Sequence, residues 1–240
     1  MKIIKILISL ALIILAPAMA VQGQTWSPQV STFDTDGEGW LVGDFYGMFP
    51  TTGSLTYSST GGNPGSYINW TQPPDHIDQW SAFLAPPKFL GDQSGCYGGT
   101  LQFDLRYPPP QQDEDIHLED SVVLEGYVAG ELTQIRYRKD KPTVNAGWLT
   151  FAIPLLADGS TSGSGWYNIT DPNNPWDLDP DSPVTEATFR SILQNLTALR
   201  IDADFSYTKD IADLDNVILR ARAIPGPRSI PGIIIPLLLD

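Results

Sequence analysis

The stretch WSAFLAPPKFLGD at residues 80–92, followed by YGGTLQFDLRY at residues 97–107, decides the fold. An apolar run leads into two prolines, and a double glycine then leads into a segment in which every second residue is apolar: Leu101, Phe103, Leu105 and Tyr107. Alternation with a period of two is typical of a β-strand that has one buried and one wet face. We therefore expect Trp80 and Phe89 to anchor a core and Gly98-Gly99 to lead into a strand over 101–107.

The same period recurs along the chain. Apolar and polar residues alternate over 149–153 and 199–206, and residues 122–127, 132–138 and 216–221 have the composition of further strands. Short strands separated by Gly, Pro, Asn and Asp predict an all-β protein, with antiparallel sheets packed as a sandwich.

One segment has a helical period instead. Four apolar residues lie at the spacing of a single helix face: Phe189, Ile192, Leu193 and Leu196. We expect one short helix over 185–196, with Ser182 as its N-cap and Pro183 in its first turn.

The two ends of the chain differ from its middle. Residues 1–20 combine a basic start, an apolar run and an A-x-A site, which predicts a secretory signal peptide and a secreted, extracellular protein. A retained membrane anchor is the alternative, although the apolar run is shorter than the ~20 residues that a spanning helix needs. Residues 224–240 combine four prolines with apolar runs, so we expect either a loosely packed end or a sorting tail that attaches the protein to a surface. One domain lies between them, over 31–223.

Charge and chemistry exclude several classes of function. The chain has 28 acidic against 14 basic side chains, a formal net charge of −14, which argues against nucleic acid or an anionic membrane as a partner. Cys96 is the one cysteine, so the chain has no internal disulfide, and we expect this residue in a turn or the core. The sequence contains two histidines, in polar loops, and no motif of a nucleophilic or metal-dependent enzyme. We therefore expect a protein without enzymatic activity.

Several short motifs, taken in order, carry a family resemblance. They are Phe33-Asp34, Glu38-Gly39-Trp40, Trp80-x5-Pro86, Phe89-Leu90-Gly91-Asp92, Tyr97-Gly98-Gly99, Val123-Leu124-Glu125-Gly126, Trp148, Phe189-x-x-Ile192-Leu193, and Leu214-Asp215-Asn216-Val217. In this order the chain resembles the laminin IV type A module, also called the laminin B domain, over roughly residues 31–223. The resemblance implies a jelly-roll β-sandwich like those of galactose-binding and carbohydrate-binding modules, with an extracellular, non-enzymatic role. It also implies that Trp40, Trp80 and Trp148, at motif positions, belong to the core. Laminin modules lie among cysteine-rich repeats that this chain lacks, so a basement-membrane role is not implied.

Acidic residues near the two ends of the domain are candidate metal ligands. Asp34 and Asp36 follow an early strand, and Asp215 lies on the last one. In related sandwich modules such acids converge on one structural ion, and calcium prefers carboxylate oxygens. The alternative is that Asp34 and Asp36 form a turn while Asp215 makes a polar contact.

Aromatic residues in Gly-, Asn- and Pro-rich stretches are candidate ligand-binding residues. Trp166, Tyr167 and Trp176 can stack on sugar rings if they are exposed, or can cap the sandwich if they fold back. Two hypotheses for function follow. The first is an adhesion or surface-structural module with an extracellular protein or matrix partner, and the alternative is a carbohydrate-binding module that acts through these aromatics. Neither implies an integral membrane partner.

Overall fold

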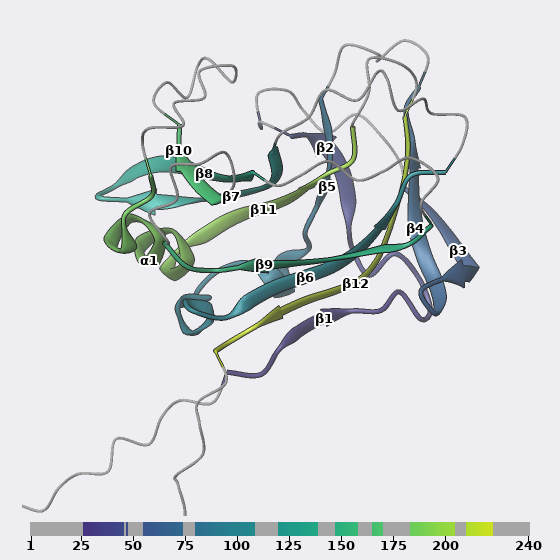
Figure 1. The fold of residues 1–240 in the computed structure, drawn as a ribbon, viewed down its shortest axis with the longest axis horizontal. Coiled ribbons are helices and arrows are strands. Elements are labelled where there is room, and N and C mark those ends of the chain that lie inside the picture. The colour runs from purple at the N-terminus through teal and green to yellow at the C-terminus, as the bar shows by residue number, and fades with distance from the viewer. Residues whose placement is uncertain are drawn as a thin grey trace, which may run out of the picture.

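The protein is described by a computed structural model that covers residues 26–45, 47, 55–73, 80–108, 120–138, 147–157, 165–169, 183–204 and 210–222. Within these ranges the strands form two antiparallel six-stranded sheets that face each other, which confirms the predicted sandwich (Figure 1). The jelly-roll connection of the strands stays a prediction.

The first sheet, sheet A, is built around the last strand. Its strand order is β3-β4-β12-β6-β9, with β1 also paired to β12. The strands are β1 (Gln29–Ser31), β3 (Thr56–Gly62), β4 (Gly65–Thr71), β6 (Thr100–Arg106), β9 (Leu149–Pro154) and β12 (Ile211–Arg220). The first half of β12 pairs with β4 and its second half with β1, while β6 accompanies both halves.

The second sheet, sheet B, has the order β10-β8-β7-β11-β5-β2. The strands are β2 (Leu41–Asp44), β5 (Ser81–Leu84), β7 (Asp120–Val128), β8 (Glu131–Arg138), β10 (Gly165–Asn168) and β11 (Leu196–Asp202). Two 3-10 turns, η1 (Pro87–Phe89) and η2 (Ser94–Cys96), connect β5 to β6, and the apolar stretch at 80–92 thereby crosses from one sheet to the other.

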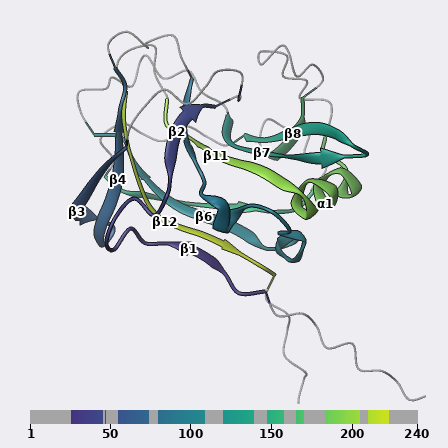
Figure 2. The ribbon, with the colours of Figure 1, turned by 180° about the vertical axis from the view of Figure 1, so that it is seen from behind.

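The predicted helix is confirmed as α1 (Glu186–Gln194). Thr185, rather than Ser182, caps its N-terminus, because the Thr185 hydroxyl accepts a hydrogen bond from the Thr188 N–H at 3.1 Å. The helix buries Phe189, Ile192 and Leu193 against the sheets, and Figure 2 shows it beside β7, β8 and β11.

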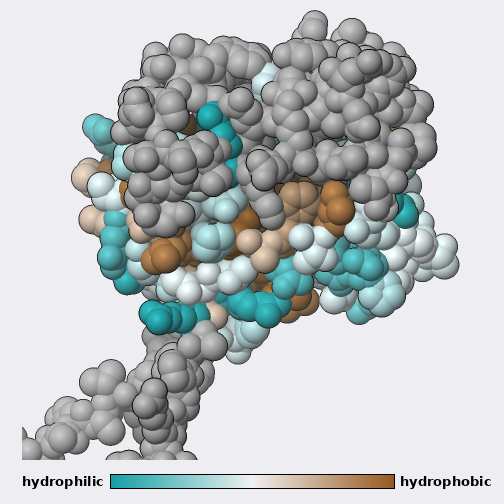
Figure 3. Space-filling model, in the orientation of Figure 1, coloured by the Kyte–Doolittle hydropathy of each residue, from teal (hydrophilic) through white to brown (hydrophobic). Residues whose placement is uncertain are grey.

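The core fills the space between the sheets. Its members with almost no exposure include Phe33, Trp40, Phe89, Cys96 and Phe103. The expected core position of Phe89 and the turn or core position of Cys96 are therefore confirmed, while Trp80 is only partly buried. At the periphery, a few large apolar side chains are exposed, among them the cross-strand pair Tyr127 and Leu132. Figure 3 shows hydrophobic and hydrophilic residues interleaved over the described part of that face.

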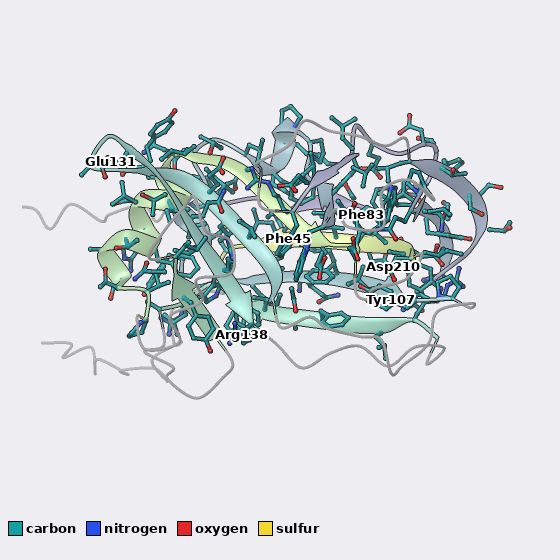
Figure 4. All side chains as sticks on the ribbon, turned by 90° about the horizontal axis from the view of Figure 1, so that it is seen from above. Phe45, Phe83, Tyr107, Glu131, Arg138 and Asp210 are labelled. Carbon is teal, nitrogen blue, oxygen red and sulfur yellow. The ribbon has the colours of Figure 1, made fainter. Side chains whose placement is uncertain are left out.

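Two ends of the sandwich differ in character. Glu131 lies at the tip of the β7–β8 hairpin, whereas Asp210 and Tyr107 lie together toward the opposite end (Figure 4). Asp210 and Tyr107 are buried, so this end of the interior is polar. Residues 1–25 and 223–240 lie outside the described residues, so the signal peptide and the tail remain predictions.

Candidate functional site

The face of sheet A that points away from the core carries a buried acidic site. Asp104 lies on β6 between Phe103 and Leu105, and strand alternation directs its side chain away from their core face. Asp215 is its direct cross-strand partner on β12. Both carboxylates are nevertheless buried, with Asp104 4% exposed and Asp215 fully buried.

The β3–β4 hairpin covers this pair. Residues 61–65, here named the hairpin tip, lie against the outer face of sheet A. The Asn63 main-chain N–H donates to Asp215 Oδ2 at 2.6 Å, and the Asn63 side-chain amide donates to Asp104 Oδ2 at 3.2 Å. Gly62 allows this approach, because a Cβ at that position would lie 2.6 Å from Asp215 Oδ2 and 2.4 Å from the Ser66 carbonyl oxygen.

Asn216 completes the polar shell. Its side-chain amide donates to Asp104 Oδ2 at 2.9 Å and also to the carbonyl oxygen of Asn63, while its main-chain N–H donates to Asp215 Oδ1 at 2.7 Å. The remaining oxygen, Asp104 Oδ1, is buried and has no hydrogen-bond partner. The donors to the pair are thus neutral amides.

The electrostatics of the site disfavour two ionised groups. The pKa of Asp215 is raised to about 6, chiefly by burial and further by the charges of Asp104 and Asp34, against the lowering effect of the Asn63 and Asn216 main-chain hydrogen bonds. The charge of Asp34 is therefore among those that act on Asp215.

Asp36 takes a different role. One of its oxygens accepts a hydrogen bond from the Glu38 N–H at 2.7 Å, which is the turn alternative that the sequence left open. Asp34 is exposed and accepts from the Thr32 hydroxyl at 2.8 Å. Among the described residues, no three His, Cys, Asp or Glu side chains are grouped as a metal site. The predicted ion at Asp34, Asp36 and Asp215 stays a prediction, and Asp104 is a residue that the sequence analysis missed.

Beside the acidic pair, an arginine lies between two aromatic rings. The Arg106 guanidinium lies 4.5 Å from the centroid of the Trp148 ring and 5.0 Å from that of Tyr67, and it pairs with Asp213 at 2.7 Å. Both Arg106 and the Trp148 indole donate to the Gly61 carbonyl oxygen, at 3.1 and 3.0 Å. Trp148 is thus half-buried on the outer face of sheet A, rather than in the core where its motif position suggested.

Two of the three predicted ligand-binding aromatics, Trp166 and Tyr167, do not lie in exposed loops. Trp166 and Tyr167 belong to strand β10 and are buried, with 1% and 4% exposure. The Trp166 indole donates to the Pro154 carbonyl oxygen at 2.7 Å, and its ring packs edge-on against Phe189. The exposed-loop placement of these two residues is corrected, because the Gly/Ser-rich stretch before them ends in a short edge strand. Trp176 lies outside the described residues, and a ligand-binding role for the three residues stays a prediction.

Comparisons with known proteins agree on one family. The Laminin B (Domain IV) family model matches residues 82–230. Human laminin subunit gamma-2 is 29% identical over 211 residues, and Xenopus tropicalis laminin subunit gamma-1 is 30% identical over 195 residues. These matches cover 82% and 78% of this chain but only 14% and 10% of the two laminin subunits.

Solved structures support the fold. The L4b domain of human laminin alpha-2 superposes with a TM-score of 0.61 at 14% identity, covering 81% of this chain and 98% of that domain. A family 30 carbohydrate-binding module aligns at a TM-score of 0.41 and 15% identity over 79% of this chain and 86% of its own, a likeness too weak to support any statement on sugar binding. In the described part of the chain, no helix has the length and apolarity to cross a membrane. The match over residues 82–230 covers more than half of the sequence, and the chain belongs to the laminin B (domain IV) family.

Proposed function

We propose that this chain is a non-enzymatic extracellular module that binds a protein or matrix partner. The observation that carries the proposal is the family match over residues 82–230, together with the laminin gamma subunits among the relatives. Because the chain spans a small part of those subunits, the module's role in this protein is inferred from the domain alone.

The burial of Trp166 and Tyr167 favours this proposal over the alternative of sugar binding through these two residues. A ring that stacks on a sugar must present an open face, and the Trp166 ring is instead packed against Phe189 and Tyr137. The buried rings therefore serve to close one side of the sandwich.

We also propose that the module binds a structural calcium ion near Asp34 and Asp215. The charge of Asp34 supports this, since it helps to raise the pKa of Asp215. The buried oxygens of Asp215 and Asp104 are the hard donors that calcium prefers.

Two assays on the purified full chain test the proposed function. The first measures binding to immobilised purified matrix proteins and to a glycan array, where saturable binding to a matrix protein is expected. The second measures turnover of a broad panel of glycoside and ester substrates. Turnover that one carboxylate or serine substitution abolishes would overturn the non-enzymatic proposal.

A further inference from the structure

Part of the outer face of sheet A, beyond the hairpin tip, is open to solvent. Two cross-strand rows of side chains make up this part, here named the open face. The first row runs across four strands through Val30, Ile218, Gln102 and Ala152, and the second across three through Arg220, Thr100 and Pro154. Their sequence neighbours Leu101, Ile153 and Leu219 are buried in the core, so strand alternation directs these seven side chains outward. Figure 1 shows β1, β12, β6 and β9 side by side.

Apolar side chains flank the polar centre of the open face on both sides. Val30 is 40% exposed beside the half-buried Ile218, and Ala152 and Pro154 are exposed on β9. Leu156, two residues beyond Pro154, is 41% exposed. Single exposed apolar residues are normal in a folded protein, but neighbouring ones on one sheet face indicate an interaction surface.

The charge of the open face is opposite to that of the whole chain. Arg220 is exposed, and the exposed Arg222 lies against the Gly98 turn, where its Cδ would be 3.4 Å from a Cβ at position 98. Within the described residues neither arginine forms an ion pair, and Arg220 only donates to Gln102 at 3.5 Å. The two rows contain no acid, although the chain has 28 acidic and 14 basic side chains.

The neighbouring charges of the described structure leave this balance unchanged. At one edge, the Lys88 ammonium donates to the Val30 carbonyl oxygen and is paired with Glu38. In the next row of the sheet, Asp104 and Asp215 are buried under the hairpin tip. The two arginines are therefore the accessible charges of the open face.

This composition fits a protein partner with carboxylates. The centres of protein interfaces are rich in apolar residues and arginine and poor in Lys, Glu and Asp, and guanidinium groups bind carboxylates with two parallel hydrogen bonds. The two rows carry no aromatic ring that would stack on a sugar. Because the rest of the chain is strongly acidic, it repels an acidic partner and restricts the contact to this face.

We propose that the open face docks a protein segment in which carboxylates lie beside aliphatic side chains, and that Arg220 and Arg222 bind the carboxylates. The inference rests on the proposed function, because it names the surface and the chemistry of the protein partner. Its test uses a model ligand, so that the two proposals fail separately.

NMR titration of the full chain with two capped hexapeptides tests the open face. One peptide alternates valine with glutamate, and the other alternates valine with lysine. The glutamate peptide should shift the amide signals of Ala152, Ile218 and Arg220 saturably, and the lysine peptide should leave them in place. No shift, equal shifts with both peptides, or shifts confined to other residues would overturn the inference.

Matched charge changes assign the binding to this face. Arg220→Glu and Ala152→Glu, both at exposed positions, should each weaken binding of the glutamate peptide about tenfold or more. Leu132→Glu adds the same charge at a side chain that is 53% exposed on sheet B, and it should bind the peptide as the parent does. Circular dichroism confirms that each variant is folded. Unchanged affinity in both open-face variants contradicts the inference.

The same variants separate this inference from the proposed function. A matrix protein that binds the parent should lose affinity for Arg220→Glu and Ala152→Glu but not for Leu132→Glu. If it binds all of them equally, the proposed function stands and the open face is not its site. If no matrix protein binds while the peptide does, the proposed function fails alone. A dimer of the parent in sedimentation that Ala152→Glu dissociates would assign the face to a second copy and overturn the inference.

Discussion

Asn63 connects Asp104 and Asp215: its side-chain amide donates a hydrogen bond to Asp104, and its main-chain N–H donates one to Asp215. In sequence, Asn63 is 41 residues from Asp104 and 152 residues from Asp215. The two carboxylates are neighbours across β6 and β12. The hairpin tip is therefore both the cover of the acidic site and part of its polar shell.

Replacing the side chain of Asn63 tests this connection. Asn63→Ala leaves the main-chain hydrogen bond to Asp215 but removes a donor from the buried Asp104 carboxylate, so we expect a loss of about 1–3 kcal/mol in the free energy of unfolding. Thr60→Ala, at an exposed position in the same hairpin, should change it by less than about 0.5 kcal/mol. Urea unfolding in EDTA measures both, and equal effects of the two substitutions would contradict the connection.

Gly62 tests the closeness of the hairpin to sheet A. A Cβ there would lie 2.6 Å from Asp215 Oδ2 on β12, and 2.4 Å from the Ser66 carbonyl oxygen of the same hairpin, a main-chain atom that cannot move aside cheaply. Gly62→Ala should destabilise the protein by about 1–3 kcal/mol. Gly37→Ala is the matched control, since its Cβ would lie 3.7 Å from Ile68 in ordinary contact. Similar unfolding midpoints for both variants would show that the hairpin tip does not approach sheet A as closely as the structure indicates.

Trp166 should behave as a core residue. Its ring is 1% exposed and contacts Tyr137 and Phe189, so Trp166→Ala is expected to cost about 3–5 kcal/mol. Tyr127→Ala, at a side chain that is 49% exposed, should cost far less. Denaturant unfolding compares them. A stable Trp166→Ala protein that loses binding to a glycan would instead favour the sugar-binding alternative.

The polar end of the sandwich predicts a specific pH dependence. Burial raises the pKa of Asp204 well above its usual range, and a hydrogen bond to the Asp210 carboxyl and the charges of Asp210 and Asp202 add to the effect, against a lowering hydrogen bond from the Ser81 main chain. The folded protein thus keeps a proton that the unfolded chain loses near pH 4. The stability that this pair contributes is complete below that pH and is lost as pH rises through the raised pKa.

Asp210→Asn isolates this effect. The variant keeps a hydrogen-bonding group at 210 but removes one of the two acids, so the difference in unfolding free energy between parent and variant should change by up to about 1.4 kcal/mol per pH unit above pH 4. Glu186→Gln serves as the control for general charge effects. Urea unfolding between pH 4 and pH 8 gives the profiles, and parallel curves for parent and Asp210→Asn would refute the effect of Asp210 on the pKa of Asp204.

Local pattern was enough to predict the sandwich and the helix. Leu101 to Tyr107 alternate as β6 requires, and the spacing of Phe189 and Ile192 gave α1. Only one of the two acids of the site could be predicted from the sequence. Asp215 belongs to a recognisable motif, whereas the alternation of β6 predicts that the Asp104 side chain is exposed to solvent. Its burial depends on the hairpin tip, a contact between distant segments that no local period encodes.

The predicted loop placement of Trp166 and Tyr167 was wrong for a related reason. Trp166 and Tyr167 follow a Gly/Ser-rich stretch that indicates a loop, but the pairing of β10 with β8 across distant sequence places them on a sheet edge. Trp148 shows the reverse case, because its motif position suggested the core and its ring lies over Arg106 on the outer face. Neighbouring segments, rather than composition, decided the burial of all three residues.

The central claim is that the chain is an extracellular module that binds a protein or matrix partner. The most direct test is equilibrium binding of the full chain, in calcium, to purified matrix proteins and to a glycan array side by side. The account predicts saturable binding to at least one matrix protein and none to the glycans. Saturable binding confined to glycans would contradict it.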